Sequence, residues 1–171
     1  MLNNWSPWYS NATEQLPYGD PITYSIAEEW LRGLYVEDWG CGYGWFRNMH
    51  VGGYKGIDGT QSRWCDAVAD LTSYKSDTPG LLLRHVLEHN HSWAQVLDNA
   101  VSSFSEKICI ILFTPIVEET TVIVENVCGL GVPDISFNIG DIVGRLDCCA
   151  SVMSVASNSV YGLETVIKAH R

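Results

Sequence analysis

Three glycines stand at alternate positions, Gly40, Gly42 and Gly44, directly after a short apolar run that ends in Asp38 and Trp39. Glycine has no Cβ, so it permits a positive φ and lets another molecule lie against the backbone. Between a strand and a helix, such a loop offers N–H groups and the positive end of a helix dipole. The triplet suits a nucleotide or a cofactor with a carboxylate; a purely structural turn is the alternative.

Two acidic side chains follow the glycines, and each ends a short apolar run. Asp58 comes about 20 residues after the loop, the spacing at which an acid can bind the two hydroxyls of a ribose. Asp70 ends the next run and could meet the exocyclic amine of an adenine. Because ligands of open parallel sheets lie at the carboxyl ends of the strands, this ordered series predicts a site for an adenine nucleoside. A turn or a helix N-cap is the alternative for both acids.

Histidines gather after the fourth apolar run, at His85, His89 and His91. Imidazole titrates near neutral pH, so it can act as a general base when an acceptor must lose a proton. Position favours His85 as that base. His89 and the preceding Glu88 stand at a turn or helix start, where capping and packing are the alternative roles.

Short helices and strands must position these groups. Asp20 and Pro21 form an N-cap and a first-turn proline for a helix that ends near Gly33, while Asn90 and Asn138 are expected to cap two later helices. The later helices are expected over residues 45–50, 61–67, 91–103 and 139–146. Strands are expected over residues 34–38, 54–58, 67–70, 81–83, 108–113, 120–124, 151–156 and 162–168. Their alternation predicts an α/β fold with a mostly parallel sheet.

The composition narrows the classes of function. The chain has 171 residues and a formal net charge of −10. This charge argues against a nucleic-acid partner, because a protein binds nucleic acid largely through many basic residues. No apolar run is long enough to span a membrane. The six cysteines show no metal-ligand spacing, so no metal site and a reduced, cytoplasmic setting are expected. A small-molecule substrate fits these observations.

The first 20 residues are rich in aromatic side chains and turn formers. Rings such as those of Trp5, Tyr9 and Tyr18 could anchor a loop on the domain. They could also form a lid over a pocket, since aromatic side chains offer rigid area with polar tips. Both roles are compatible.

In this order of motifs the chain resembles the class I S-adenosylmethionine-dependent methyltransferases. The stretch 36–44 corresponds to the family's first motif, and the later matches are Gly56-Ile57-Asp58-Gly59, Ala69-Asp70-Leu71, residues 83–89 and residues 110–115. The resemblance covers about residues 34–115. A dinucleotide-binding loop would need a glycine at Trp45, so the cofactor implied is S-adenosylmethionine. The fold implied is the Rossmann-like three-layer methyltransferase fold, with an antiparallel C-terminal strand.

The resemblance also implies a role for each matching residue. Asp38 would orient the loop or contact the cofactor's amino group, Asp58 would bind the ribose and Asp70 the adenine amine. The other expected cofactor contacts are Gly40, Cys41, Gly42, Tyr43, Gly44, Gly59, Leu71 and Arg84. His85 would be the catalytic residue. Trp5, Tyr9, Tyr18 and His89 are expected to bind the substrate.

The function expected is methyl transfer to a small molecule whose acceptor atom is open. One alternative is a non-methylating cleavage of the same cofactor, and another is a non-catalytic or cofactor-binding scaffold domain. We expect a single domain with a lid and helix (1–33), a cofactor-binding core (34–115) and a C-terminal sheet on the substrate side (116–171). No Asn-Pro-Pro-Tyr-like motif follows the fourth strand, which counts against exocyclic amines of nucleic-acid bases as acceptors.

Overall fold

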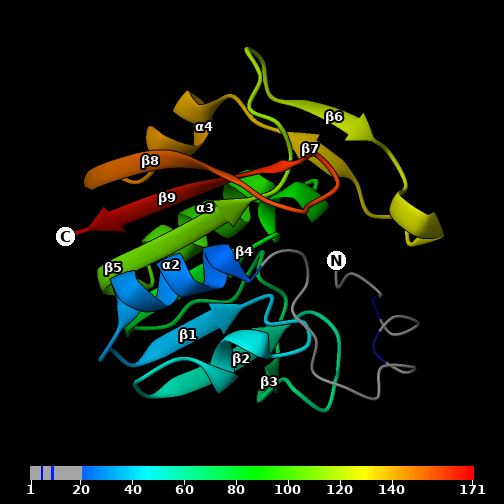
Figure 1. Ribbon diagram of the computed structural model, residues 1–171. Coiled ribbons are helices and arrows are strands. Elements are labelled where there is room, and N and C mark those ends of the chain that lie inside the picture. Colours follow the sequence, from blue (N-terminus) through cyan, green and yellow to red (C-terminus); the bar gives the residue numbers. More distant parts are fainter. Residues whose placement is uncertain (1–4, 6–8, 10–20) are drawn as a thin grey trace.

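The computed structural model describes Trp5, Tyr9 and residues 21–171, and its centre is a seven-stranded sheet in the order β3-β2-β1-β4-β5-β9-β8 (Figure 1). The strands are β1 (Val36–Trp39), β2 (Tyr54–Asp58), β3 (Ala67–Val68), β4 (Thr78–Arg84), β5 (Phe104–Leu112), β8 (Cys149–Ala156) and β9 (Leu163–His170). Strands β1 to β5 run parallel, whereas β9 is antiparallel to both β5 and β8. The expected mostly parallel sheet with an antiparallel C-terminal strand is confirmed.

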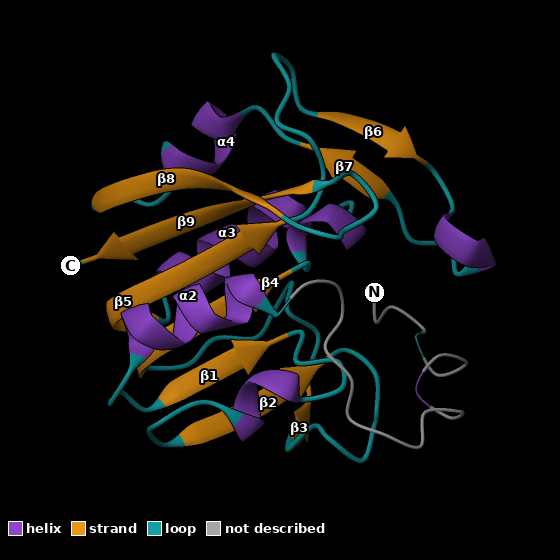
Figure 2. Ribbon diagram, in the orientation of Figure 1, coloured by secondary structure: helices purple, strands orange, loops and turns teal. Residues whose placement is uncertain are grey.

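Helices cover both faces of this sheet (Figure 2). Helix α2 (Ile22–Leu31) packs on one face, while α3 (Trp93–Val101) and α4 (Ile139–Val143) pack on the other. Successive residues of the central strands serve opposite faces because a strand has a two-residue period. Leu81 and Leu83 of β4 therefore join the cluster under α3 and α4, and Leu82 joins the cluster under α2.

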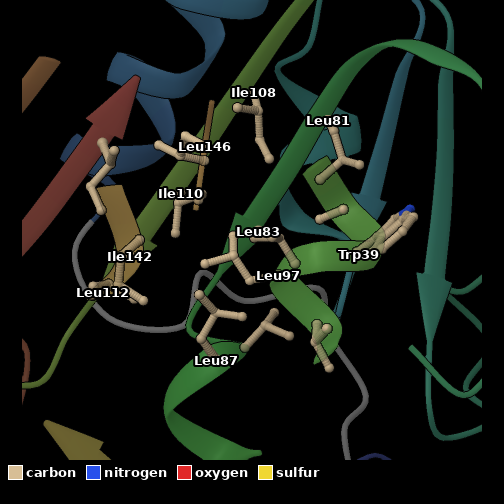
Figure 3. Packing of buried hydrophobic residues seen from close by; sticks show 14 of the residues in the cluster. Trp39, Leu81, Leu83, Leu87, Leu97, Ile108, Ile110, Leu112, Ile142 and Leu146 are labelled. Atoms are coloured by element: carbon tan, nitrogen blue, oxygen red, sulfur yellow. The ribbon is translucent and has the colours of Figure 1, made fainter. Parts of the chain in front are cut away.

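Figure 3 shows the cluster under α3 and α4, where Leu97 of α3 and Ile142 of α4 lie near side chains of the central strands. Leu83, Ile110 and Leu97 are at most 1% exposed. This continuous apolar layer explains the unbroken apolar runs in the sequence, since such strands need cover on both faces. Burial of this kind stabilises the folded state by about 25 cal/mol per Å² of apolar surface removed from water.

A second, two-stranded sheet pairs β6 (Thr121–Val124) with β7 (Asp134–Ser136) in antiparallel fashion. It belongs to the long connection between β5 and β8, which also holds α4. Asn138 caps α4, and its side-chain oxygen accepts a hydrogen bond of 2.7 Å from Gly140 N, as expected. The segment places Asp134 beside the carboxyl end of β4, where His89 lies.

Two helix expectations were wrong or inexact. Residues 61–66 form turns and Ala67 begins β3, so no helix forms here, because Ser62 Oγ accepts the backbone N–H groups of Trp64 and Cys65 at 3.2 Å each. Such local bonds compete with helix formation. The helix expected from Asn90 begins only at Trp93, and Ser92 rather than Asn90 precedes it. Asp20, the expected cap of α2, lies outside the described residues.

The connections in the β1–β3 half of the sheet are short. Residues 40–53, 59–66 and 69–77 are all described, and they contain no α-helix. A 3₁₀-helix over Trp45–Asn48 is the helical element of the first connection. No helix in the described part of the chain is long and apolar enough to cross a membrane.

Candidate cofactor site

The glycine loop follows β1 at the carboxyl edge of the sheet, with three left-handed residues: Gly40 has φ +78°, Gly42 +53° and Gly44 +63°. Residues other than glycine rarely adopt this backbone conformation. The loop also makes a close contact, because a Cβ on Gly40 would overlap Val86 Cγ2. These glycines are therefore needed for the path of the backbone and for the approach of the segment after β4.

Asp58, at the end of β2, holds the loop in place. Its Oδ2 accepts a hydrogen bond of 3.0 Å from Gly42 N, and its Oδ1 accepts one of 2.9 Å from Thr60 N. The hydroxyl of Tyr9 donates to the same Oδ2 at 3.4 Å. Burial raises the pKa of Asp58, and these hydrogen bonds oppose the rise. The carboxylate is thus joined to the glycine loop and already receives a hydroxyl group.

Asp38 lies under the loop, almost completely buried at the end of β1. Tyr54 donates its hydroxyl to Asp38 Oδ2 at 2.8 Å. Burial raises the pKa of Asp38 to about 7, against the opposing effect of the Tyr54 hydrogen bond. A cationic group placed beside it would favour the ionised form. The expected contact of Asp38 with an amino group stays a prediction.

Asp70 and Leu71 have structural partners at the end of β3. Asp70 Oδ1 accepts from the backbone N and the hydroxyl of Thr72, at 3.0 and 2.7 Å, which caps a turn and lowers the pKa of Asp70. Leu71 is buried in the cluster under α3, and its carbonyl accepts from Asn99 Nδ2 at 2.9 Å. Their expected contacts with an adenine stay predictions.

A buried polar network surrounds the end of β4 on the side of α2. Arg84 donates to Glu164 Oε1 of β9 at 2.9 Å, and its guanidinium lies 4.0 Å from the ring centroid of Tyr24. His85 contacts the same oxygen of Glu164 through Nε2 and has an unusual φ of +57°. Burial lowers the pKa of His85 to about 4, although Glu164 opposes this. The catalytic role expected of His85 stays a prediction.

His89 lies on the other side of the β4 end. Its Nδ1 is 3.0 Å from the carbonyl of Pro133 and 3.2 Å from Asp134 Oδ1. Burial alone would lower the pKa of His89, but Asp134 and the neighbouring Glu88 outweigh it, so the pKa is raised. The sequence singled out His89 but contained no sign of this partner 45 positions away.

Two of the aromatic residues near the N-terminus lie over this edge. Trp5 N donates to Thr60 Oγ1 at 3.1 Å, and the Trp5 ring meets the His89 ring with centroids 5.1 Å apart. Tyr9 contacts the ring of Tyr43 at 5.4 Å as well as Asp58. Tyr18 lies outside the described residues. Trp5 and Tyr9 thus contact residues at the carboxyl edge of the sheet, and their expected binding of a substrate stays a prediction.

Sequence reasoning missed Asp134, Tyr161 and Glu164, all in the C-terminal third. Glu164 had a usable signal, since it is a lone acid at the start of an apolar β-rich run. Asp134 and Tyr161 stand in irregular stretches without a periodic pattern. Among the described residues, no cluster of three or more His, Cys, Asp or Glu side chains could hold a metal ion.

Comparison with known proteins gives matches in structure alone. No protein-family model matches the chain, and none of the curated proteins matches it. A solved 1,6-didemethyltoxoflavin-N1-methyltransferase of Burkholderia thailandensis, with 1,6-didemethyltoxoflavin and S-adenosylhomocysteine bound, is similar with a TM-score of 0.69 and 12% identity, over 97% of this chain and 81% of that one.

Two further structures show the same likeness. Magnesium protoporphyrin IX methyltransferase of Synechocystis, with S-adenosylhomocysteine bound, has a TM-score of 0.61 and 13% identity over 88% of this chain and 82% of that one. The 4+2 cyclase SpnF has a TM-score of 0.61 and 11% identity over 88% of this chain and 80% of that one. The chain therefore has the fold that these proteins share, and one of the three is named a cyclase.

Proposed function

We propose that this chain is an S-adenosylmethionine-dependent methyltransferase that acts on a small molecule. The observation that carries the proposal is the position of Asp58, whose buried carboxylate joins the glycine loop at Gly42 N and accepts the Tyr9 hydroxyl. An acid in this place can accept the hydroxyls of a ribose. The structures of similar fold that hold S-adenosylhomocysteine support the same cofactor.

The residues present fit this cofactor. A Cβ on Gly42 would lie 3.7 Å from the Tyr9 hydroxyl, which is bound to Asp58, so the missing side chain leaves the loop backbone of 40–44, with Cys41 and Tyr43, open toward that carboxylate. Asp38 would take the amino group, Asp58 the ribose and Asp70 the adenine amine, beside Gly59, Leu71 and Arg84. When bound, the cofactor supplies an electrophilic methyl group. The chain would position an acceptor in line with that group, which by itself accounts for much of a methyl transfer.

Binding of S-adenosylhomocysteine by isothermal titration calorimetry tests the proposal. We expect wild-type protein to bind it, and Asp58→Ala to weaken binding about tenfold or more, because hydrogen bonds to a buried charged group are lost. Asp98→Ala is the matched control, since Asp98 pairs with Arg145 on the exposed side of α3. Absence of binding by the wild type would overturn the proposal.

Tyr9 gives a second candidate function some weight. Its hydroxyl occupies a ligand position of Asp58, as expected for a non-catalytic domain whose pocket is filled by its own side chains. Mass spectrometry of the products with a panel of acceptors separates the candidates: a methylated product supports the enzyme, binding without turnover supports the scaffold, and cofactor fragments without methylation support cleavage.

The proposal also assigns the parts of the chain. We infer one domain, in which residues 34–115 bind the cofactor and residues 1–33 and 116–171 supply the acceptor side. This division agrees with the contacts of Trp5 and Asp134 around His89. A cytoplasmic enzyme without nucleic-acid or membrane partners fits the charge of −10.

A further inference from the structure

Strand β8 is the last strand at one edge of the main sheet (Figure 1). It pairs with β9 without a bulge, from the pair Cys149 and His170 to the pair Ala156 and Leu163. Within the described residues, no backbone group of β8 bonds to any segment other than β9. Because the backbone groups of alternate residues point outward in an antiparallel strand, those groups are available to one more strand.

The sequence of β8 lacks the features that usually protect such an edge. Its eight residues, Cys-Ala-Ser-Val-Met-Ser-Val-Ala, include no charged residue and no proline. Natural edge strands are protected from other strands by charges, proline, bulges or short length. The opposite edge of this sheet has the last of these features, since β3 has two residues. Of these two edges, β8 is therefore the one that offers a long, regular strand.

Both faces of β8 carry exposed aliphatic side chains at the middle of the strand. Val152 is 47% exposed and Met153 is 41% exposed, and successive residues of a strand point to opposite faces. Every residue of β8 except Val155 is exposed, whereas the strands at the centre of the sheet are covered by helices. An added strand would thus cover apolar surface on both faces and also bond to the backbone.

The charge of the chain favours a second copy of this chain as the partner. The formal net charge is −10, and a net charge far from zero makes copies of a protein repel one another. A strand without charged residues places no like charges opposite each other when it pairs with itself, in whatever register. Antiparallel pairing of one strand with its own copy also has two-fold symmetry, which is the commonest symmetry of homo-oligomers.

We propose that the chain forms a homodimer in which the β8 strands of two copies pair antiparallel and join the two sheets into one. This proposal does not depend on the proposed function. The hydrogen-bonding pattern limits the register, because residues with outward backbone groups must face residues of the same kind, which alternate along the strand. The two-fold axis must therefore pass through a residue of β8 and not between two residues. Val152 and Met153 are the central positions, so one of them should face its own copy.

Sedimentation equilibrium of the full chain measures the dimer. We expect wild-type protein at micromolar concentrations to have twice the 19.0 kDa mass of one chain. Val152→Lys should raise the dissociation constant of the dimer about tenfold or more, because it brings two like charges together at the paired edge. Val68→Lys is the matched control, since Val68 is an exposed valine of β3 at the opposite edge, and it should leave the dissociation constant unchanged.

Disulfide cross-linking tests the register, and it decides the case if Val152→Lys does not fold, as judged by circular dichroism. Val152→Cys and Met153→Cys are oxidised separately in a background in which the exposed Cys128 and Cys149 are replaced by serine. The residue on the axis lies opposite its own copy, with Cα atoms about 4.5–5.5 Å apart, and should form an intermolecular disulfide. The other residue is displaced along the strand beyond the roughly 7 Å that a disulfide spans, so it should stay reduced.

The outcomes are separate from those that test the cofactor. Strands β4, β5 and β9 lie between β1 and β8, so we expect S-adenosylhomocysteine to bind the wild type and Val152→Lys equally. A monomeric wild type would overturn the dimer, whatever its affinity for that ligand. A dimer that Val152→Lys leaves intact, or that Val68→Lys dissociates, would overturn β8 as the interface, as would cross-linking at neither Val152→Cys nor Met153→Cys.

Discussion

Tyr9 donates its hydroxyl to Asp58 Oδ2 at 3.4 Å, and the same oxygen accepts Gly42 N at 3.0 Å. Tyr9 thereby forms a hydrogen bond with the carboxylate that we propose to bind the ribose. Burial also raises the pKa of the Tyr9 phenol, so the group is a hydroxyl at neutral pH. Tyr9 and a bound ribose would compete for one acceptor.

Tyr9→Phe should therefore strengthen binding of S-adenosylhomocysteine. The expected increase in affinity is about 2- to 10-fold, because the ligand would no longer have to break the hydrogen bond between Tyr9 and Asp58. Calorimetry measures it directly. Tyr35→Phe, at a half-exposed tyrosine on another edge, should leave the affinity unchanged. Weaker binding by Tyr9→Phe would instead mean that the hydroxyl contributes to the bound state.

Gly40→Ala should destabilise the protein more than Gly33→Ala, although both positions have a φ near +80°. At Gly33 an added Cβ meets nothing, so the cost is that of the left-handed conformation, about 1–2 kcal/mol. At Gly40 the overlap with Val86 adds about 1–3 kcal/mol. Urea denaturation gives the difference in the free energy of unfolding. The second substitution Val86→Ala should recover part of the loss at Gly40, and equal costs at the two glycines would contradict the contact.

The two ion pairs Arg84–Glu164 and Arg145–Asp98 should respond differently to loss of one carboxylate. Glu164 is buried and shared by Arg84, His85 and Thr23, so Glu164→Gln leaves a buried charge and should cost about 3–5 kcal/mol of unfolding free energy. Asp98→Asn breaks an exposed pair and should cost at most about 1 kcal/mol. Similar losses of unfolding free energy in the two variants, measured by thermal or urea denaturation, would contradict this prediction.

Glu88 should lower the stability of the protein as the pH rises from about 4.5 to 7, whereas His85, whose pKa is lowered to about 4, opposes this change over much of the same window. Burial raises the pKa of Glu88 to about 7, so between its unfolded and folded pKa values the folded state binds more protons than the unfolded state. The loss attributable to Glu88 is about 3 kcal/mol over this window and is complete above pH 7. Asp38 contributes in the same direction.

Glu88→Gln should flatten this profile, with Glu106→Gln on the exposed side of β5 as its control. The glutamine can still accept the hydrogen bond that Phe113 N donates to Glu88 Oε1 at 2.6 Å. Urea denaturation at several pH values measures the effect, and an unchanged slope in Glu88→Gln would contradict a buried, neutral carboxyl.

The strands that carry cofactor motifs could be predicted because their signals are local. The expected strand over 54–58 coincides with β2, and Asp58 lies at its end beside the glycine loop. The turns at 61–66 could not be predicted. The hydroxyl of Ser62 accepts backbone N–H groups that a helix would otherwise use, and the sequence pattern does not show this hydrogen bonding.

The acceptor side was harder to predict for a different reason. His89 and Asp134 are brought together by β7, a three-residue strand paired with β6 outside the main sheet. Contacts between segments so far apart leave no period or spacing in the sequence. Tyr161 in the turn between β8 and β9 reaches Asp134 in the same way. After Phe113 the strands over 120–124, 151–156 and 162–168 were expected, but β7 and the contacts of Asp134 were not.

The connections without α-helices imply unequal local stability across the sheet. Helices α2 and α3 pack against β4 and β5, while β3 is a two-residue edge strand with Val68 41% exposed. Backbone amides of β2 and β3 should thus exchange with deuterium by local opening, and those of β4 and β5 only by global unfolding. A ligand that joins Gly42, Asp58 and Asp70 would slow exchange in the weaker half first. Hydrogen exchange with and without S-adenosylhomocysteine would show whether the cofactor stabilises β2 and β3 against this local opening.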